Sequence, residues 1–312
     1  MPLKWLLPVW QSPLFLCIYD SQSFQTMKTR LLFIPLLFLN CCLCAVAQTS
    51  LDSLTLVRAE WNVNKTPEGL VQKSISLPCL YGGPQHICLI EVPRKPRRCF
   101  NVAFSPDNQM RRTSAFASDE QALAAINGSF YNMKVGNSVC YLAVDGTVID
   151  TTTASEAKLR ANAALYLYKG KVRVMPWSPI VEKNYRKRKG TTLVSGPLLL
   201  KKGQTVSWQS CDSAFIATKH PRSVLFTKSN GTTVFLTVDG RAKGNAIGMS
   251  IPELAHLVQV LGGKDAINLD GGGSTTLWMR NAPYNGILNC PSDNRIFDHL
   301  GERNVSNVIF VK

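Results

Sequence analysis

The residues best suited to chemistry lie in one short stretch, where Asp270 is followed by three glycines and a serine at 271–274. The apolar run at 266–269 predicts a short buried strand ahead of the acid. Three consecutive glycines allow positive φ angles and let the backbone approach a ligand closely. Exposed N–H groups in such a turn form a concave site for an anion. The alternative is a tight connection in which Asp270 only caps the turn, because glycine clusters punctuate many folds.

A second acid, Asp239, ends another apolar run, and a basic motif that contains His220 and Arg222 opens the run before it. Paired carboxylates are the usual equipment of glycoside cleavage, and an arginine fork suits phosphate or carboxylate groups. Taken singly, each motif is more often an ordinary turn or strand start. Together they predict a site in which an acid and an anion cradle meet, with distant backbone segments converging on the glycine turn.

Strands that end in glycine turns must position these residues. Apolar runs flank X-Gly dipeptides in four places, which is the strongest short-range hairpin signal. The predicted hairpins span 139–149, 163–175, 198–208 and 223–238, with turns at 145–146, 169–170, 202–203 and 230–231. Further strands are predicted at 54–61, 86–92, 99–104, 125–131 and 305–311.

Two helices are predicted from capping patterns. Ser250 and Glu253 form a capping box, and a second such pattern predicts a short helix that begins at Ser118. The apolar face of the first helix comprises Leu254, Leu257, Val258 and Leu261. The predicted fold class is α+β, with strand-rich mixed sheets built from hairpins and a few helices packed on them.

The N-terminal residues carry a targeting pattern. A charged start at Met27, an apolar run at 31–39 and small residues at 45–47 predict a signal peptide over 27–47. We interpret 1–26 as an upstream start-site artefact and 48–312 as a single domain. A membrane anchor is the alternative, but the apolar run is short for a span. We therefore expect export to the periplasm or the extracellular side of the envelope, with no stable membrane span after cleavage.

Cysteine use agrees with export. The expected mature chain keeps six cysteines, Cys79, Cys88, Cys99, Cys140, Cys211 and Cys290. Cys79 and Cys88 bracket a glycine turn and are the expected disulfide pair, with free buried thiols as the alternative for others. No Cys-x-x-Cys spacing or Cys/His cluster in the sequence indicates zinc.

The formal charge of +15 favours an anionic partner, either an anionic envelope or an anionic substrate. Nucleic acid is not expected, because the chain has no zinc finger, helix-turn-helix or aromatic RNA-binding signature. We interpret the basic run at 185–189 as a solvated loop.

Eight short motifs occur in a set order along the chain. They are Ala-Ile-Asn-Gly-Ser-Phe (125–130), Ser-Gly-Pro-Leu-Leu (195–199), His-Pro-Arg (220–222), Val-Asp-Gly-Arg (238–241), Gly-Met-Ser-Ile-Pro-Glu-Leu (248–254), Asn-Leu-Asp-Gly-Gly-Gly-Ser-Thr-Thr (268–276), Pro-Ser-Asp (291–293) and Glu-Arg-Asn-Val-Ser-Asn (302–307). In this order they resemble the phosphodiester glycosidase family over roughly residues 100–312. Two residues depart from the family's pattern, and one of them, Ser129 in place of a glycine, is expected to narrow the pocket. The other is Asn304 in place of a proline.

The resemblance implies hydrolysis of a sugar-1-phosphodiester at the bond between the anomeric carbon and oxygen. A phosphate ester leaves readily, so the site should hold phosphate and stabilise an oxocarbenium-like centre. The expected catalytic carboxylate is Asp270 or Asp239. His220, Arg222 and the amides of 271–274 would hold phosphate, and three other residues, Asn127, Asn268 and Thr275, would bind sugar hydroxyls. The full expected set of substrate-binding residues is Asn127, Gly128, Ser195, His220, Arg222, Arg241, Asn268, Gly271, Gly272, Gly273, Ser274, Thr275 and Arg303.

The expected partner is a carbohydrate phosphodiester substrate, and no cofactor is expected to be required. The many loop acids suggest a structural calcium ion, although no loop has EF-hand spacing. Two alternatives stay open from the sequence: a non-catalytic envelope module that binds anionic polysaccharide, and a protein of exopolysaccharide metabolism.

Overall fold

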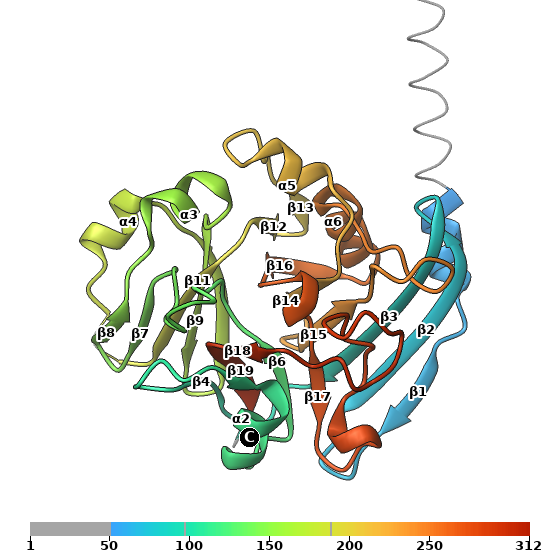
Figure 1. Ribbon diagram of the computed structural model, residues 1–312, viewed down its shortest axis with the longest axis horizontal. Helices are drawn as coiled ribbons and strands as arrows, with labels where there is room; N and C mark the ends of the chain where they lie inside the picture. Colours follow the sequence, from blue (N-terminus) through green and yellow to red (C-terminus); the bar gives the residue numbers. More distant parts are fainter. Residues whose placement is uncertain (1–50, 97, 188) are drawn as a thin grey trace, which may run out of the picture. The chain divides into compact units, whose positions relative to one another are not determined.

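The largest sheet has eight strands in this computed structural model, which describes residues 51–96, 98–187 and 189–312 (Figure 1). In spatial order its strands are β1 (Asn62–Lys65), β2 (Val71–Leu80), β3 (Gly83–Val92), β15 (Thr233–Val238), β14 (Arg222–Lys228), β16 (Gly263–Asn268), β12 (Leu198–Lys201) and β13 (Gln204–Thr205). Arg222 lies opposite Val238, and Val224 lies opposite Asn268. The start of β14 and the ends of β15 and β16 therefore share one end of the sheet.

The other strands form smaller sheets. One contains β10 (Lys171–Pro176), β9 (Ala163–Tyr168), β11 (Thr191–Ser195), β7 (Leu142–Val144) and β8 (Thr147–Asp150). Another contains β17 (Leu277–Met279), β6 (Ala124–Asn127), β19 (Asn307–Val311) and β4 (Phe100–Phe104), and a two-stranded ribbon pairs β18 (Asn304–Val305) with β5 (Arg111–Arg112). The strand-rich α+β class is confirmed. Strand pairing is antiparallel throughout the described residues rather than mixed, both within hairpins and between strands that are distant in sequence.

All four predicted hairpins form, as β7–β8, β9–β10, β12–β13 and β14–β15. Three of their turns have positive φ at both central residues, for example 46° at Asp145 and 87° at Gly146. This backbone twist matches the right-handed twist of the flanking strands. The turn signals were therefore local, and the strands could be predicted from them.

The predicted capping box of helix α6 (Ile251–Val260) is confirmed. Ser250 N donates to Glu253 Oε2 at 2.8 Å, and Glu253 N donates back to Ser250 Oγ at 3.5 Å. The shorter helices are α2 (Thr113–Asp119), α3 (Ala154–Leu159), α4 (Pro179–Asn184) and α5 (Ser213–Ala217), with 3₁₀ turns η1 (Gly272–Ser274) and η2 (Tyr284–Gly286). Across the described ranges, no helix is both long and apolar enough to cross a membrane.

Two predicted elements are wrong. Residues 51–58 are helical rather than part of a strand at 54–61, since Asp52 and Leu56, four residues apart, are the buried pair. No helix begins at Ser118, which instead lies in the last turn of α2 (Thr113–Asp119). The N-terminal N–H of α2 at Ser114 bonds Glu302, a cap that is distant in sequence and leaves no local signal.

The core lies on both faces of the eight-stranded sheet. Leu225, Phe235 and Ile267 point to one side, into a cluster shared with the smaller sheets. The alternating strand residues point to the other side; they include Val224, Phe226 and Leu236, and they share a cluster with Leu254 and Val258 of α6. This two-sided burial holds the ends of β14, β15 and β16 firmly in place. Leu51–Lys312 form one unit, while the predicted artefact, signal peptide and cleavage point at 1–47 lie outside the described residues.

The predicted Cys79–Cys88 disulfide is wrong. The β2–β3 hairpin turns at Tyr81 and Gly82, so Cys88 lies opposite Ser74, while Cys79 lies beside the turn. Four strand residues separate the two positions by roughly 13 Å, well beyond the reach of a disulfide. All six cysteines of the described residues are free thiols.

Candidate active site

Backbone segments from distant parts of the chain converge on the glycine turn after β16. Gly272 N donates to Pro221 O at 2.9 Å, and Asp270 N donates to Gly128 O at 2.9 Å. A Cβ atom at Gly271 would lie 2.6 Å from Pro221 O, which shows why this position needs glycine. The turn is therefore held by hydrogen bonds to the segment before β14 and to the segment after β6.

Asn127 fastens the turn from inside. Its Nδ2 donates to Asp270 O at 2.6 Å, while its Oδ1 accepts Thr276 N at 3.1 Å and Ser223 Oγ at 2.6 Å. The side chain is fully buried. Both polar atoms of the Asn127 side chain are thus used, and together they connect β6 to β14 and to the turn at 270–276.

The Asp270 carboxylate lies at the lip of the turn and keeps partial exposure. Its Oδ1 accepts Gly271 N at 2.9 Å. Desolvation raises the pKa of Asp270 to about 6, against the lowering effects of the Ser274 hydroxyl, Arg160, the Gly271 amide and Arg303. An acid with such a pKa can serve near neutral pH as a base, a nucleophile or a proton donor.

Arginines flank this carboxylate. Arg160 stacks on Phe130, with Cζ 3.8 Å from the ring centroid, and its Nε donates to Glu156 Oε2 at 2.9 Å. Arg303 lies against Gly273 and pairs with Asp293, its Nε donating to Oδ1 at 2.7 Å. Both cations act on the pKa of Asp270, so they lie within electrostatic reach of it.

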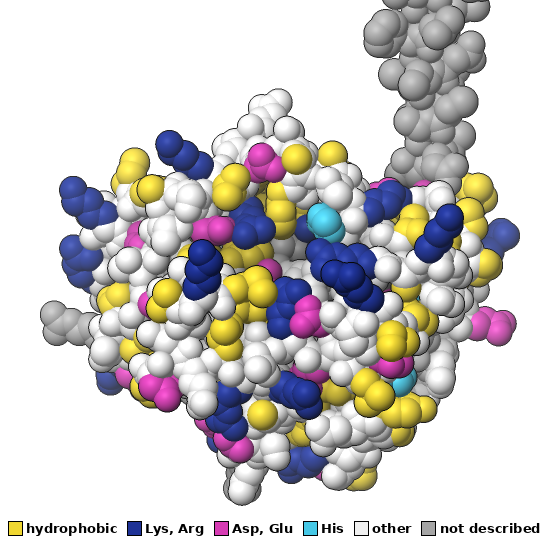
Figure 2. Space-filling model, viewed as in Figure 1, with side chains coloured by type: hydrophobic (Ala, Val, Ile, Leu, Met, Phe, Trp, Pro, Cys, Tyr) yellow, Lys and Arg dark blue, Asp and Glu magenta, His cyan; other side chains and the backbone are white. Residues whose placement is uncertain are grey.

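A third arginine and a histidine complete the basic surroundings. A Cβ at Gly272 would lie 2.9 Å from Arg241 Nη2, so the exposed Arg241 side chain covers the turn. Burial and the charges of Arg222 and Arg241 lower the pKa of His220, which is therefore neutral at pH 7. Figure 2 shows a hollow in this face of the molecule, with basic side chains and a histidine gathered around it.

Arg222 is enclosed rather than open. Its Nε donates to Met249 O at 2.9 Å, and its Nη2 donates to Thr218 O at 2.7 Å and Phe215 O at 3.2 Å. Burial, Arg160 and Arg241 lower its pKa to about 10, so it stays charged at neutral pH. Arg222 thus adds positive potential while most of its donors hold backbone carbonyls.

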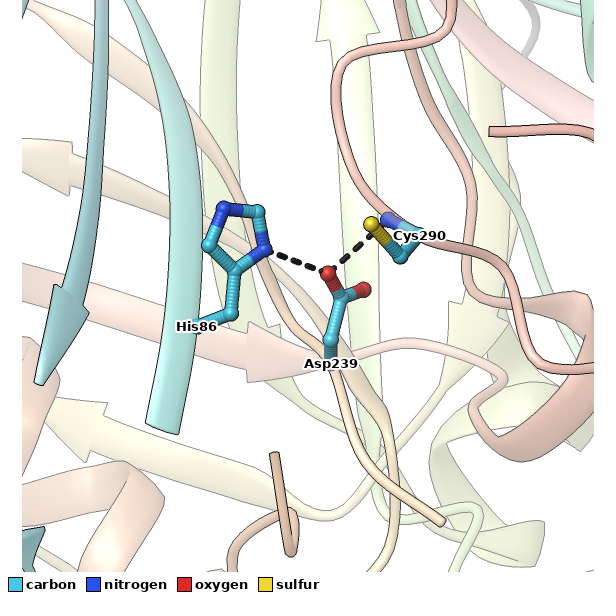
Figure 3. Close-up of side chains that lie close together, drawn as sticks. All are labelled: His86, Asp239 and Cys290. Atoms are coloured by element: carbon cyan, nitrogen blue, oxygen red, sulfur yellow. Dashed lines mark hydrogen bonds and ion pairs between the residues drawn. The ribbon is translucent and has the colours of Figure 1, made fainter. Parts of the chain in front are cut away.

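Asp239 has surroundings entirely different from those of Asp270. Its carboxylate accepts His86 Nδ1 at 2.6 Å, Asn289 Nδ2 at 2.9 Å and Cys290 N at 2.8 Å (Figure 3). Asp239 is 1% exposed. Among the described residues, no hydrogen-bond partner is common to the two carboxylates, so each is held by its own set of donors. That the two acids act as a catalytic pair stays a prediction.

The amides predicted to cradle phosphate are mostly engaged. Gly271 N bonds Asp270 Oδ1, Gly272 N bonds Pro221 O, and Ser274 N bonds Gly271 O at 3.2 Å. Gly128 likewise exchanges its backbone bonds with Asp270 and Asn307. Three of the four amides at 271–274 are therefore already bonded within the protein, and phosphate binding by this turn stays a prediction.

Three further predicted residues, Ser195, Asn268 and Thr275, are buried beside the turn. Asn268 Nδ2 donates to Gly196 O and Leu269 O, both at 2.7 Å. Within the described part of the chain, Ser195 Oγ, Asn268 Oδ1 and Thr275 Oγ1 have no hydrogen-bond partner. Binding of sugar hydroxyls by Asn268 and Thr275, and binding of substrate by Ser195, stay predictions, and each of these three atoms has unused bonding capacity.

Arg160 and Tyr131 are not among the site residues predicted from the sequence. Tyr131 OH donates to Asn304 O at 2.9 Å and lies 3.5 Å from Ser274 Oγ, next to the carboxylate. Tyr131 directly follows the motif at 125–130, and this position in the sequence could have indicated a site residue. Arg160 has no motif around it, so the sequence gives no such indication. Ser129, expected to narrow the pocket, is buried and bonds Ser138 Oγ at 3.0 Å.

Comparison with known proteins identifies the fold and the family. The catalytic domain of zebrafish N-acetylglucosamine-1-phosphodiester α-N-acetylglucosaminidase, solved in a form auto-inhibited by its pro-peptide, is 19% identical, with a TM-score of 0.61 over 81% of this chain and 87% of that one. A Synechocystis protein is 16% identical, with a TM-score of 0.60 over 81% and 64% of the two chains. A Burkholderia pseudomallei K96243 protein is 14% identical, with a TM-score of 0.51 over 75% of each chain.

No curated protein matches the chain. A family model described as phosphodiester glycosidase matches residues 120–312, which include every motif of the site from Asn127 to Arg303. The resemblance seen in the sequence is thereby confirmed, and the chain belongs to the phosphodiester glycosidase family.

Proposed function

We propose that this protein hydrolyses a sugar-1-phosphodiester, with water replacing the phosphate at the anomeric carbon. The observation that carries the proposal is Asp270, a carboxylate with a pKa of about 6 that lies within electrostatic reach of Arg160 and Arg303. The glycosidase family supports the same reaction class. The products are a free reducing sugar and a phosphate monoester.

Asp270 is the carboxylate that faces the anomeric carbon in this proposal. Arg241 and Arg303 hold the phosphate oxygens as charge-assisted donors, and neutral His220 adds a hydrogen bond. The same arginines stabilise charge that develops on the departing phosphate. In this proposal Asp239 and Asn127 position the turn and do not react. Asp239 accepts a hydrogen bond from Asn289, which also donates to Thr275 O at 3.1 Å, and Asn127 donates to Asp270 O.

The test is turnover of a panel of sugar-1-phosphodiesters, read as free reducing sugar. Asp270→Asn is expected to lower kcat by about 10²- to 10⁴-fold, the range for one acid–base or nucleophilic group, while substrate binding persists. Asp265→Asn, at the solvent side of the same strand, is the matched control and is expected to keep normal turnover. Binding of the diesters without any hydrolysis would instead favour the non-catalytic module.

We further propose that the enzyme acts outside the cytoplasm after removal of residues 27–47. The pattern at 27–47 and the small residues before Gln48 support this. N-terminal sequencing of the protein recovered from the cell envelope or medium is expected to begin at Gln48. Recovery of only the uncleaved chain in the cytoplasmic fraction would contradict it.

A further inference from the structure

Three side chains with metal-binding atoms meet around Asp239. They are His86 on β3, Asp239 after β15 and Cys290 in the segment after η2, and Figure 3 shows them facing one another. One ligand atom from each lies within 4.8 Å of the other two. Asp239 and Cys290 are 1% and 8% exposed. The wide separation of the three positions in sequence hid this cluster from spacing rules.

We propose that His86, Asp239 and Cys290 bind a thiophilic divalent cation, for which zinc is the best match. Imidazole nitrogen, carboxylate oxygen and thiolate sulfur are the three ligand types of protein zinc sites. Calcium and magnesium take oxygen ligands, so this cluster is distinct from the structural calcium that the loop acids suggested. Three protein ligands also leave a fourth position for water or another small ligand.

The distances suit such an ion after a small adjustment. Bonds of about 2.0 to 2.3 Å place neighbouring ligand atoms of a tetrahedral zinc site roughly 3.3 to 3.8 Å apart. His86 Nδ1 and Asp239 Oδ2 are 2.6 Å apart and would open slightly, since the ion takes the place of the proton between them. The sulfur lies within 4.8 Å of the other two ligand atoms, so it would move by roughly 1 Å at most to reach a tetrahedral spacing.

Charge around the cluster also favours a cation. His86 and Cys290 line a cavity of about 600 Å³, and none of its lining residues is lysine or arginine, although the chain carries a formal charge of +15. Asp298 lines the same cavity and adds a second acid. A dication bound to one carboxylate, one thiolate and a neutral imidazole forms a neutral centre, which is the state that burial favours. The thiol proton leaves to solvent on binding. The imidazole gives up its Nδ1 proton and takes one up at Nε2, so the ring stays neutral.

Neighbouring donors already orient the ligands. Asn289 Nδ2 bonds Asp239 Oδ1 at 2.9 Å, and Cys290 N bonds Oδ2 at 2.8 Å. Such outer partners are typical of built metal sites. Asn289 Oδ1 also accepts Leu277 N at 2.8 Å, so the bound ion would fasten the segment that follows the glycine turn.

The test is a cobalt titration of the purified protein, reduced and freed of metal by a chelator. Co²⁺ bound to a thiolate gives a sulfur-to-cobalt charge-transfer absorption, and we expect one equivalent per chain that zinc displaces. Cys290→Ser is expected to remove that absorption, and His86→Ala to weaken binding by more than the roughly 10- to 100-fold loss typical of an outer partner. X-ray absorption of the zinc-loaded wild-type chain should show one sulfur among nitrogen and oxygen neighbours, which needs no variant.

Cys79→Ser is the matched control, because Cys79 is an exposed thiol on the strand next to β3. Cys79→Ser is expected to bind cobalt as the wild type does. Asp270→Asn is also expected to bind cobalt normally while losing glycosidase turnover, so the metal site and the proposed activity can fail independently. Lack of the charge-transfer absorption, its survival in Cys290→Ser, or zinc spectra without sulfur would each overturn the metal site and mark the cluster as a hydrogen-bonded network only.

Discussion

At the scale of single residues, the pKa of Asp270 leads to a prediction about pH. Phosphate needs little protonation to leave, so Asp270 is expected to act in its ionised form. Because desolvation raises its pKa to about 6, kcat/KM should rise as the pH increases through about 6 and then level off.

Arg160 lowers the pKa of Asp270, so Arg160→Gln should move the rising limb of this profile to higher pH. The measurement is the apparent pKa of kcat/KM against pH. Lys158→Gln removes the same charge from the same helix, two residues away, and should leave the limb in place. A profile that falls through pH 6 would instead assign Asp270 a proton-donating role.

At the scale of elements, α2 depends on a partner far along the chain. Glu302 Oε1 accepts Ser114 N at 2.7 Å, and its Oε2 accepts Ser114 Oγ at 2.6 Å. Glu302→Ala leaves these donors without their acceptor and should lower the free energy of unfolding by about 1 to 3 kcal/mol. Glu302→Gln keeps an acceptor and should lose less. The check is the midpoint and slope of denaturant unfolding.

Glu120, at the other end of α2, provides the comparison. Its bond to Lys312 at 3.0 Å is a surface ion pair, and such pairs contribute about 0 to 1 kcal/mol. Glu120→Ala is therefore expected to have the smaller effect. Equal losses for the alanine variants at both ends would contradict the long-range cap.

The same elements show what local sequence can predict. Turns such as Asp145-Gly146 and the Ser250–Glu253 box carry their own signals, because the residues that stabilise them are neighbours in the chain. The start of α2 could not be predicted, since its cap is 188 residues away. Likewise Asp270 was evident from its glycines, whereas Arg160 depends on stacking against Phe130 and Phe215 from other elements.

At the scale of the whole molecule, the formal charge is +15, and lysine or arginine side chains gather around the hollow seen in Figure 2. A field of this sign attracts an anionic phosphodiester, and salt screens it over about 8 to 10 Å. The proposed function therefore predicts that KM rises with ionic strength while kcat changes little.

Arg241 should account for a large share of this effect, because its side chain covers Gly272 at the turn. Arg241→Gln is expected to raise KM by about tenfold or more, the loss of one charge-assisted hydrogen bond, and to flatten the dependence of KM on salt. Lys264→Gln removes the same net charge at the start of β16, the end of the strand remote from Asp270. If substrate attraction came from net charge alone, the two variants would shift KM equally; a local arginine cradle requires the Arg241 variant to shift it far more.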